Sequence, residues 1–331
     1  TFGNALPFLF KILAAAEPLS IQCHPNLEQA RAGFAADNAA GLALDAPNRN
    51  YRDDNHKPEL IVALEEFWAL KGFRAPQEIQ TLVSAAKLES LGERLPLLQG
   101  ADGLARFFHA LWTLGNEERQ ALLEELRAGL AGLPSNEARW TKSLLQKYPG
   151  DIACIAPLLL QLVKLEAGEG LYLGAGELHA YLQGTGLEIM ANSDNVLRGG
   201  LTPKHMDVEE LMKVLRFEHR PISLLRACQM QPDSTAQSAE AEARAQLKGY
   251  TTPCREFALF TLDLDPAADY QHVLSSATIF LSLGGQTEFR WGEESLRLEE
   301  GGVAFATADT QDLRLRGNAN LWIATVGTEH D

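Results

Sequence analysis

Helical periodicity occupies one central block of this chain, and short β-strands are predicted on both sides of it. Between about Ala75 and Tyr148, the segments LARFFHALWTL and RQALLEELRAGL repeat apolar residues at intervals of three and four. Pro76 stands at a favourable first helical position, and Asn116 precedes two glutamates as a helix N-cap would. Because this period does not suit a strand, we predict a helical domain inserted into a mainly β chain.

Alternating or short apolar runs with turn residues between them make up the rest of the chain. Before the helical block, they predict strands at 19–24 and 59–64 around a helical stretch at 26–44. After the block, we expect three short strands, a helix capped by Asp207, and a long loop or weak helix over 229–249. Five further runs between 257 and 326 predict a C-terminal sandwich or barrel of jelly-roll type. The predicted class is therefore α+β, mainly β.

The length of the chain suggests how many domains it has, and its charge limits the kinds of molecule that it can bind. The 331 residues suggest two or three domains, and 29 basic against 44 acidic residues give a net charge of −15. This field repels nucleic acid and anionic membranes, and no apolar run is long enough to span a bilayer or to form a convincing signal peptide. The four cysteines lie far apart without a C-x-x-C motif, which is typical of a reducing cytosol. We expect a cytoplasmic protein with a small-molecule partner, and a phosphorylated one would need a local basic cluster.

Metal-capable side chains gather around three predicted strands. Gln22 and His24 are two apart and share a face, although one such histidine is more often an ordinary hydrogen-bonded residue. The polar loop YRDDNHKPE leads straight into a core strand, which makes Glu59 a candidate inward carboxylate. Glu177 and His179 are predicted to share a face with Tyr181, so either glutamate is a candidate ligand. Two imidazoles, a carboxylate and an amide oxygen suit Zn²⁺, with Fe²⁺ or Mn²⁺ as alternatives.

A second polar segment, GLEIMANSDNVLRGGLTPKH, follows the last of these strands. It surrounds a Gly-Gly pair with charged residues, namely Glu188, Asp194, Arg198, Lys204 and His205. A glycine-rich connection with charged flanks would have the same composition as a site.

Taken together, these segments resemble type I phosphomannose isomerases. Residues 51–59 fit that family's pattern Y-x-D-x-N-H-K-P-E, and residues 179–204 are similar to its second signature, with Gly199 where the family usually has Ala. The segments FLFKIL and PLSIQCHPN also resemble family segments in the expected order. The resemblance is strong from residue 1 to about 216, and the family carries roughly seventy further residues before TFGNALPFLFK, so we expect the chain to lack that part.

The resemblance implies a fold and a domain order. We expect a cupin-type catalytic barrel formed by 1–74 and 151–216, with a helical domain at 75–150 inserted between the two halves. Residues 217–331 are then expected to form a second jelly-roll domain.

The resemblance also assigns the site, and it selects Glu59 over Glu177 as the carboxylate ligand. It places one Zn²⁺ per chain on Gln22, His24, Glu59 and His179. It implies catalytic roles for His56, Lys57, Glu188, Asp194 and Arg198. The residues expected to bind substrate are Lys11, Ser20, Lys57, Tyr181, Arg198 and Lys204.

The implied activity is the zinc-dependent interconversion of mannose 6-phosphate and fructose 6-phosphate through an enediol-type proton transfer. Such an enzyme would supply mannose 6-phosphate for mannose metabolism and GDP-mannose synthesis, and we expect it to act as a monomer. One alternative is an iron-dependent cupin oxygenase, which explains the metal ligands but not the basic cluster. The other is a non-catalytic sugar-phosphate binding or storage protein on the same scaffold, which would bind sugar without turnover.

Overall fold

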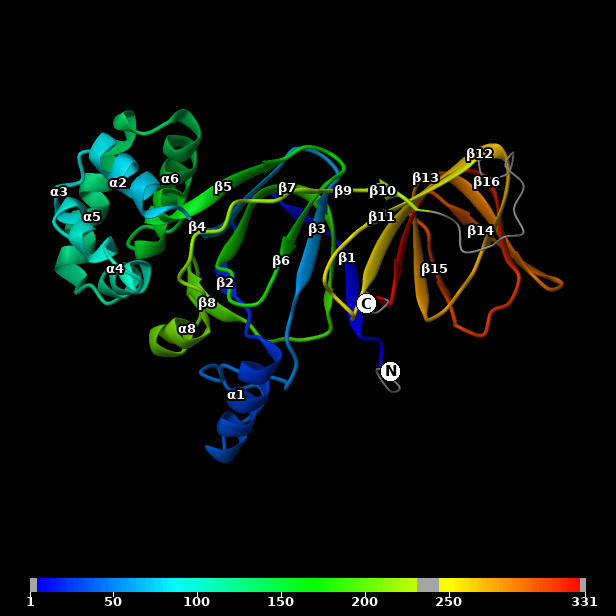
Figure 1. Cartoon of the computed structure of the whole chain (residues 1–331), viewed down its shortest axis with the longest axis horizontal. Coiled ribbons are helices and arrows are strands. Elements are labelled where there is room, and N and C mark those ends of the chain that lie inside the picture. Colours follow the sequence, from blue (N-terminus) through cyan, green and yellow to red (C-terminus); the bar gives the residue numbers. More distant parts are fainter. Residues whose placement is uncertain (1–4, 231–243, 328–331) are drawn as a thin grey trace.

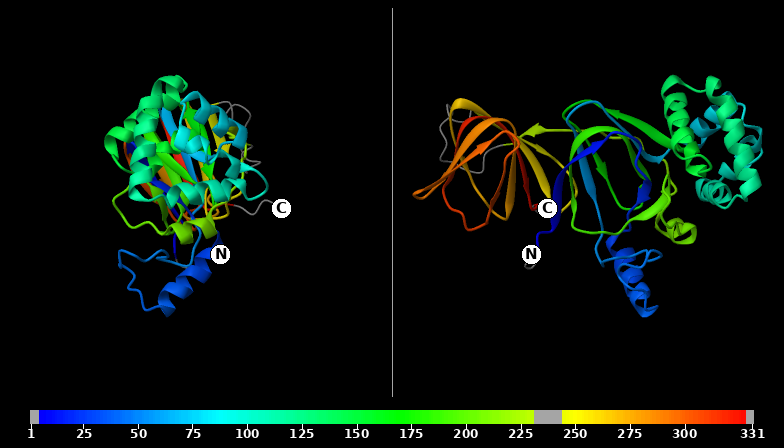
Figure 2. Two further views of the ribbon diagram at one scale, coloured as in Figure 1. Left: turned by 90° about the vertical axis from the view of Figure 1, so that its left-hand side faces the viewer. Right: turned by 180° about the vertical axis from the view of Figure 1, so that it is seen from behind.

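Three parts lie in a row along the molecule. The structure is a computed structural model that describes residues 5–230 and 244–327. A group of helices stands at one end, a first sheet in the middle and a second sheet at the other end (Figure 1). The view from behind shows the same order (Figure 2). The prediction of a mainly β chain with a helical insertion is confirmed. Among the described residues, no helix has both the length and the apolar character needed to cross a membrane.

The first sheet is continuous across the helical insertion. In the described residues it contains nine strands: β1 Phe8–Ala15, β2 Ile21–Cys23, β3 Glu59–Ala63, β4 Phe67–Phe73, β5 Leu160–Leu165, β6 Glu169–Leu173, β7 His179–Ala191, β8 Leu197–Gly200 and β9 Leu225–Arg226. Strands β4 and β5 flank the helices in sequence and pair with each other antiparallel. The helical block is therefore a long excursion between two neighbouring strands, and it leaves the sheet uninterrupted.

Strand β7 runs through two regions in which the sequence predicts separate strands. Its first half pairs with β4, and its second half pairs with both β1 and β3. An extra residue between Tyr181 and Gln183 shifts the register against β4, and Gly184 follows with φ of 126°. A bulge of this kind re-aims the side chains that follow it. As a result Tyr181 and Glu188, which have opposite parity along the chain, meet through a 2.7 Å hydrogen bond.

The helices cover one end of the first sheet and its lower edge. Six of the described α-helices lie between β4 and β5: α2 Pro76–Ala85, α3 Glu89–Gly92, α4 Gly103–Trp112, α5 Asn116–Gly129, α6 Ser135–Lys147 and α7 Ala156–Leu159. As predicted, Pro76 opens α2 at its first position. The N-cap prediction for Asn116 is wrong, because α5 begins at Asn116 and Gly115 is its N-cap.

Two more described α-helices lie outside this group: α1 Leu27–Ala39 and α8 Val208–Val214. Asn26 caps α1 by accepting a hydrogen bond from the Gln29 amide at 2.8 Å. The predicted Asp207 cap of α8 is confirmed, because its carboxylate accepts a hydrogen bond from the Glu210 amide at 2.9 Å.

The strands of the second sheet begin and end at different residues from those that the sequence predicts. Its described strands are β10 Cys228–Gln229, β11 Ala245–Tyr250, β12 Ala258–His272, β13 Thr278–Trp291, β14 Glu294–Glu299, β15 Val303–Ala306 and β16 Leu313–Thr325. Two runs predicted as separate strands form β13, because the Gly284–Gly285 pair is accommodated by a register shift instead of a turn. The predicted loop or weak helix over 229–249 instead includes most of strand β11, and residues 231–243 lie outside the described ranges.

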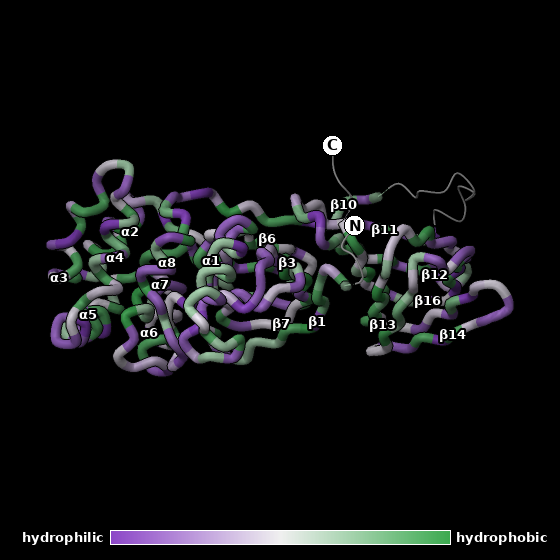
Figure 3. Tube along the Cα trace, turned by 90° about the horizontal axis from the view of Figure 1, so that it is seen from below, coloured by the Kyte–Doolittle hydropathy of each residue, from purple (hydrophilic) through white to green (hydrophobic). Residues whose placement is uncertain are grey.

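A shared hydrophobic core joins the two sheets. Phe8 and Leu60 of the first sheet pack in one cluster with Phe257, Leu281 and Trp322 of the second. Figure 3 shows hydrophobic segments at this junction, near the labels of β1 and β13. The Tyr250 hydroxyl also donates a 2.8 Å hydrogen bond to the Gly168 carbonyl across it. The second sheet is thus packed firmly against the first.

Candidate metal centre

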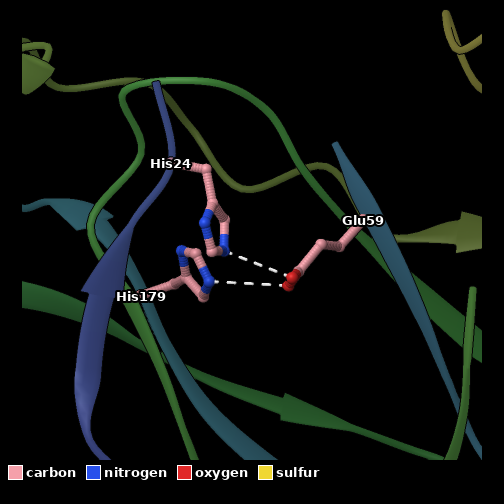
Figure 4. A group of neighbouring side chains, drawn as sticks. All are labelled: His24, Glu59 and His179. Carbon is pink, nitrogen blue, oxygen red and sulfur yellow. Dashed lines mark ion pairs between the residues drawn. The ribbon is translucent and has the colours of Figure 1, made fainter. Parts of the chain in front are cut away.

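Two histidines and a glutamate converge in the interior of the first sheet (Figure 4). His24 follows β2, Glu59 opens β3 and His179 opens β7, and each side chain is buried. The Glu59 carboxylate lies 3.2 Å from His24 Nε2 and 3.6 Å from His179 Nε2. The two ring centroids are 5.1 Å apart. Three donor atoms from distant parts of the chain thus point at one small volume.

Backbone carbonyls orient both imidazole rings. Nδ1 of His24 lies 2.7 Å from the Asn195 carbonyl oxygen, and Nδ1 of His179 lies 2.8 Å from the Glu177 carbonyl oxygen. Because a carbonyl can only accept, Nδ1 carries the proton in each neutral ring and Nε2 keeps its lone pair. Both Nε2 atoms and one Glu59 oxygen are buried without a hydrogen-bond partner. Orphaned buried donor atoms of this kind fit a bound cation.

The electrostatics of the cluster match a metal-binding state. Burial lowers the pKa of His24, so the ring is neutral near pH 7 and able to coordinate. Burial opposes ionisation of Glu59, but the Lys57 ammonium 3.2 Å away favours the charged carboxylate. Two neutral nitrogens and a carboxylate form a donor set that suits Zn²⁺. Gln22, the predicted fourth ligand, lies on β2 opposite His179 in the register, which is consistent with that role without testing it.

A second polar group lies beside the cluster. Lys11 on β1 pairs in register with Glu188 on β7, and its ammonium lies 2.7 Å from the Glu188 carboxylate. The Tyr181 hydroxyl donates to the other Glu188 oxygen at 2.7 Å. Burial and the nearby charge of Glu59 raise the pKa of Glu188, although Lys11 and Tyr181 oppose this effect. The group is therefore a buried carboxyl that can hold or release a proton near the cluster.

Three of the other predicted site residues lie next to these groups. Lys57 is half-buried, and its ammonium is 3.2 Å from Glu59. Arg198 on β8 lies opposite Gln22 in the register, and Ser20 directly precedes β2. Burial and the neighbouring charge of Arg52 lower the pKa of Arg198. The structure thus places cationic groups around the cluster in a chain whose net charge is −15.

Three other predicted site residues have their described contacts away from the cluster or are exposed. Lys204 and Asp194 are exposed, and the Asp194 amide donates to the Asp53 carboxylate. His56 turns toward the second sheet, where its Nε2 lies 2.8 Å from the Glu256 carboxylate. His109, which the sequence places outside the metal site, is a partly exposed residue of α4 that lies 3.4 Å from Glu209.

Comparison with known proteins supports this geometry. Residues 1–76 match the family model described as phosphomannose isomerase type I, catalytic domain. A mannose-6-phosphate isomerase of Salmonella typhimurium is 39% identical over 323 residues, which cover 97% of this chain and 78% of the relative. The chain belongs to the mannose-6-phosphate isomerase family. The relatives extend to animals, since the rat mannose-6-phosphate isomerase is 33% identical over 347 residues, covering 98% of this chain and 78% of that protein.

Solved structures of family members agree with the fold and the metal. A zinc-bound mannose 6-phosphate isomerase superposes with a TM-score of 0.88 at 36% identity, covering 99% of this chain and 80% of that one. A variant of phosphomannose isomerase from Salmonella typhimurium gives the same TM-score and identity. The predictions of the family, the cupin fold, an isomerase and a zinc cofactor are confirmed.

The expectation that Glu177 and His179 share one strand face is wrong. In the isomerase fold, β7 begins only at His179, and Glu177 lies in the turn before it. The Glu177 carboxylate accepts the Gly174 amide at 2.7 Å and lies 3.5 Å from the Lys71 ammonium. Only its backbone carbonyl serves the site, by orienting His179.

Two residues that hold the centre together were not singled out from the sequence as site residues. Asn195 is fully buried, and its side chain donates to the carbonyls of Asp53 and Asn55 and accepts from the Arg52 amide at 2.7 Å. Its own carbonyl orients His24. The Asp53 carboxylate binds back to the Ser193 hydroxyl and the Asp194 amide, both at 2.7 Å. Asp53 lies in the first family motif and Asn195 in the second, and this position was the sequence signal that could have identified them as site residues.

Proposed function

We propose that the chain interconverts mannose 6-phosphate and fructose 6-phosphate, and that its residues move a proton between C2 and C1 through an enediol. The observation that carries this proposal is the buried His24–Glu59–His179 cluster with Lys57 and Glu188 beside it, in a chain that belongs to this enzyme family. We propose Gln22 as the fourth protein ligand. When bound, zinc would supply a Lewis acid that polarises the sugar oxygens.

The protein's own groups have separate tasks in this reaction. Lys57 and Arg198 stabilise negative charge that develops on the sugar oxygens, because a fixed cation in a buried site is worth more than one in water. The candidates for the proton carrier are Glu188, His56 and Asp194. Glu188 combines burial with two hydrogen-bonding partners, whereas the His56 imidazole is held by one contact with the Glu256 carboxylate.

Phosphate recognition requires positive charge that overcomes the acidic surface. We propose that Lys11, Ser20, Tyr181, Arg198 and Lys204 contribute to substrate binding, with the cations and the hydroxyls addressing different oxygens. We propose that the enzyme acts as a monomer. The four cysteines are unpaired, which supports a cytoplasmic location, and the activity would supply mannose 6-phosphate for GDP-mannose synthesis.

We also propose the domain division given above. Residues 75–150 contain helices α2 to α6, which contribute nothing to the metal cluster among the described residues. Residues 217–331 contain every described strand of the second sheet but also β9 of the first, so that boundary falls within a region of shared packing.

The test is a direct assay with mannose 6-phosphate. The zinc-loaded chain should produce fructose 6-phosphate, a chelator should abolish the activity, and added zinc should restore it. Free mannose serves as the matched substrate, and it should turn over far more slowly because the phosphate contacts are lost. Tight binding of mannose 6-phosphate without any fructose 6-phosphate would reject the proposal in favour of a binding protein.

A further inference from the structure

The second sheet contributes a carboxylate to the edge of the catalytic region. Glu256 lies in the segment between β11 and β12, and its Oε1 is 2.8 Å from His56 Nε2. The two residues are 200 positions apart in the sequence; His56 precedes β3 of the first sheet and Glu256 precedes β12 of the second. His56 directly precedes Lys57, whose ammonium contacts the Glu59 ligand. The contact therefore links the second sheet to the loop that leads into the metal cluster.

Glu256 is held firmly on its own side. Its second carboxylate oxygen accepts a hydrogen bond from the Cys254 thiol at 3.1 Å. Cys254 and Phe257, on either side of it, are buried in the core that the two sheets share. The Glu256 side chain itself is only 12% exposed, so water competes weakly for its oxygens. Because the Glu256 carboxylate is held in one position, it can fix the orientation of the His56 ring.

The contact has a definite chemical consequence for His56. A carboxylate only accepts, so the proton of a neutral His56 ring resides on Nε2 and Nδ1 keeps its lone pair. Among the described residues, Nδ1 of His56 has no hydrogen-bond partner. The nitrogen that can exchange a proton with another molecule is therefore Nδ1, and Glu256 sets the orientation of the ring.

We infer that Glu256 is a positioning residue for the isomerase reaction, which it serves by orienting His56 from the second sheet. The inference rests on the proposed function and on a catalytic role for His56. It gives the C-terminal sheet a part in the reaction although that sheet supplies no metal ligand among the described residues. Glu256 acts through His56 and does not itself touch the substrate.

A series of variants separates orientation from simple support of the fold. Glu256→Ala removes the acceptor and should lower kcat about 10- to 100-fold with little change in KM, as is usual when an outer partner of a functional imidazole is lost. Glu256→Gln keeps an acceptor oxygen and should recover most of that loss. Zinc content should remain that of the unchanged chain in both variants. The control Glu299→Gln alters an exposed glutamate of β14 and should leave kcat and KM unchanged.

The decisive comparison is a double-mutant cycle with His56→Ala. If Glu256 acts through His56, Glu256→Ala lowers kcat no further once His56 is gone. Equal losses in both backgrounds would overturn the inference and leave Glu256 as a structural contact between sheets. An unchanged kcat in Glu256→Ala would overturn it as well.

The two proposals fail in different ways. A chain that never converts mannose 6-phosphate contradicts the proposed function itself. An active chain in which His56→Ala has normal kcat keeps that function but rejects His56, and Glu256 with it, as part of the reaction. If Glu256→Ala fails to fold, Glu256→Gln decides the matter in the same cycle, since its partial loss of kcat must vanish in the His56→Ala background.

Discussion

The first sheet encloses ionisable side chains, whereas the described interior of the second sheet is apolar. His24, Glu59, His179 and Glu188 are each at most 2% exposed inside the first sheet. The core of the second sheet is formed by residues such as Phe280, Phe289 and Leu321, and its buried polar side chains in the described ranges are hydroxyls. Burying a charged group costs free energy unless it is paired. The ionisable residues inside the first sheet therefore stabilise the fold less than apolar residues would, but they can bind a metal and transfer protons. The second interior stabilises the chain and, through the shared core, its neighbour.

The largest expected effect comes from removing a ligand of the first interior. His24→Ala should lose zinc and should lose activity on the order of a thousandfold, because a bound metal contributes several kcal/mol to the transition state. His109→Ala, at a partly exposed position of α4, is the matched control and should keep both. Metal analysis and the isomerase assay measure the two quantities. Full zinc occupancy in His24→Ala would contradict the assignment of the centre.

Replacing a large side chain inside the second sheet by alanine should lower stability and leave zinc binding intact. Phe280 is fully buried, and Phe280→Ala should lower the free energy of unfolding by about 3–5 kcal/mol through lost packing. The folded fraction should still bind zinc, because no cluster member lies in that sheet among the described residues. Denaturant titration and metal analysis on the same sample test this. A Phe280→Ala variant with normal stability and no bound zinc would contradict the division of roles between the two sheets.

Arg198 tests whether the first interior uses its cations for catalysis or for binding. Arg198→Lys keeps the charge but loses the planar fork, so kcat should fall on the order of a hundredfold with zinc content unchanged. Steady-state kinetics separate the two roles. A normal kcat with a large rise in KM for mannose 6-phosphate would make Arg198 a substrate anchor.

The support of the metal ligands should be measurable separately from the ligands. Asn195→Ala should weaken zinc binding about 10- to 100-fold, because the loop whose carbonyl orients His24 loses its side-chain clamp. Competition with a chelator measures the affinity. Asn192→Ala is the control, since within residues 5–230 and 244–327 that exposed side chain donates to the Leu6 carbonyl and makes no hydrogen bond to the loop whose carbonyl orients His24. Equal zinc affinity in the two variants would mean that the backbone alone holds the loop.

The smallest effect concerns the contact between the sheets at low pH. Burial alone would raise the pKa of Glu256, but His56 and Cys254 outweigh it and bring the pKa to about 2, below the ordinary 4.5. The stabilisation is therefore present above pH 4.5 and is lost as the pH falls toward 2. Its size should be on the order of 2 kcal/mol, reduced by partial exposure to solvent. Between these pH values, the free energy of unfolding should depend less on pH for Glu256→Gln than for the unchanged chain. An equal pH dependence in the two proteins would refute the linkage.

Local patterns were sufficient to predict the class of the fold and to single out His24, Glu59 and His179 as candidates, but the choice of Glu59 over Glu177 came from the family resemblance. The change of period near Ala75, the alternation of Gln22 with His24, and the loop that ends in Glu59 are properties of neighbouring residues. Such properties predicted the inserted helices and the inward side chains. They failed where glycines looked like turns, because Gly184 and Gly284 lie inside the long strands β7 and β13 as part of register shifts. A single chain segment cannot show whether a neighbouring strand will absorb an extra residue.

The sequence by itself determined which donor types are available, and through its motifs it identified the family to which they belong. Only the tertiary structure decided which atoms meet. It turned Glu177 away from the centre, joined Tyr181 to Glu188 across a bulge, and paired His56 with Glu256 from the other sheet. The physical reason is that hydrogen bonds and ion pairs depend on distances of about 3 Å, which are set by strand register and by the packing of two sheets. Neither of these is encoded by the neighbours of any one residue.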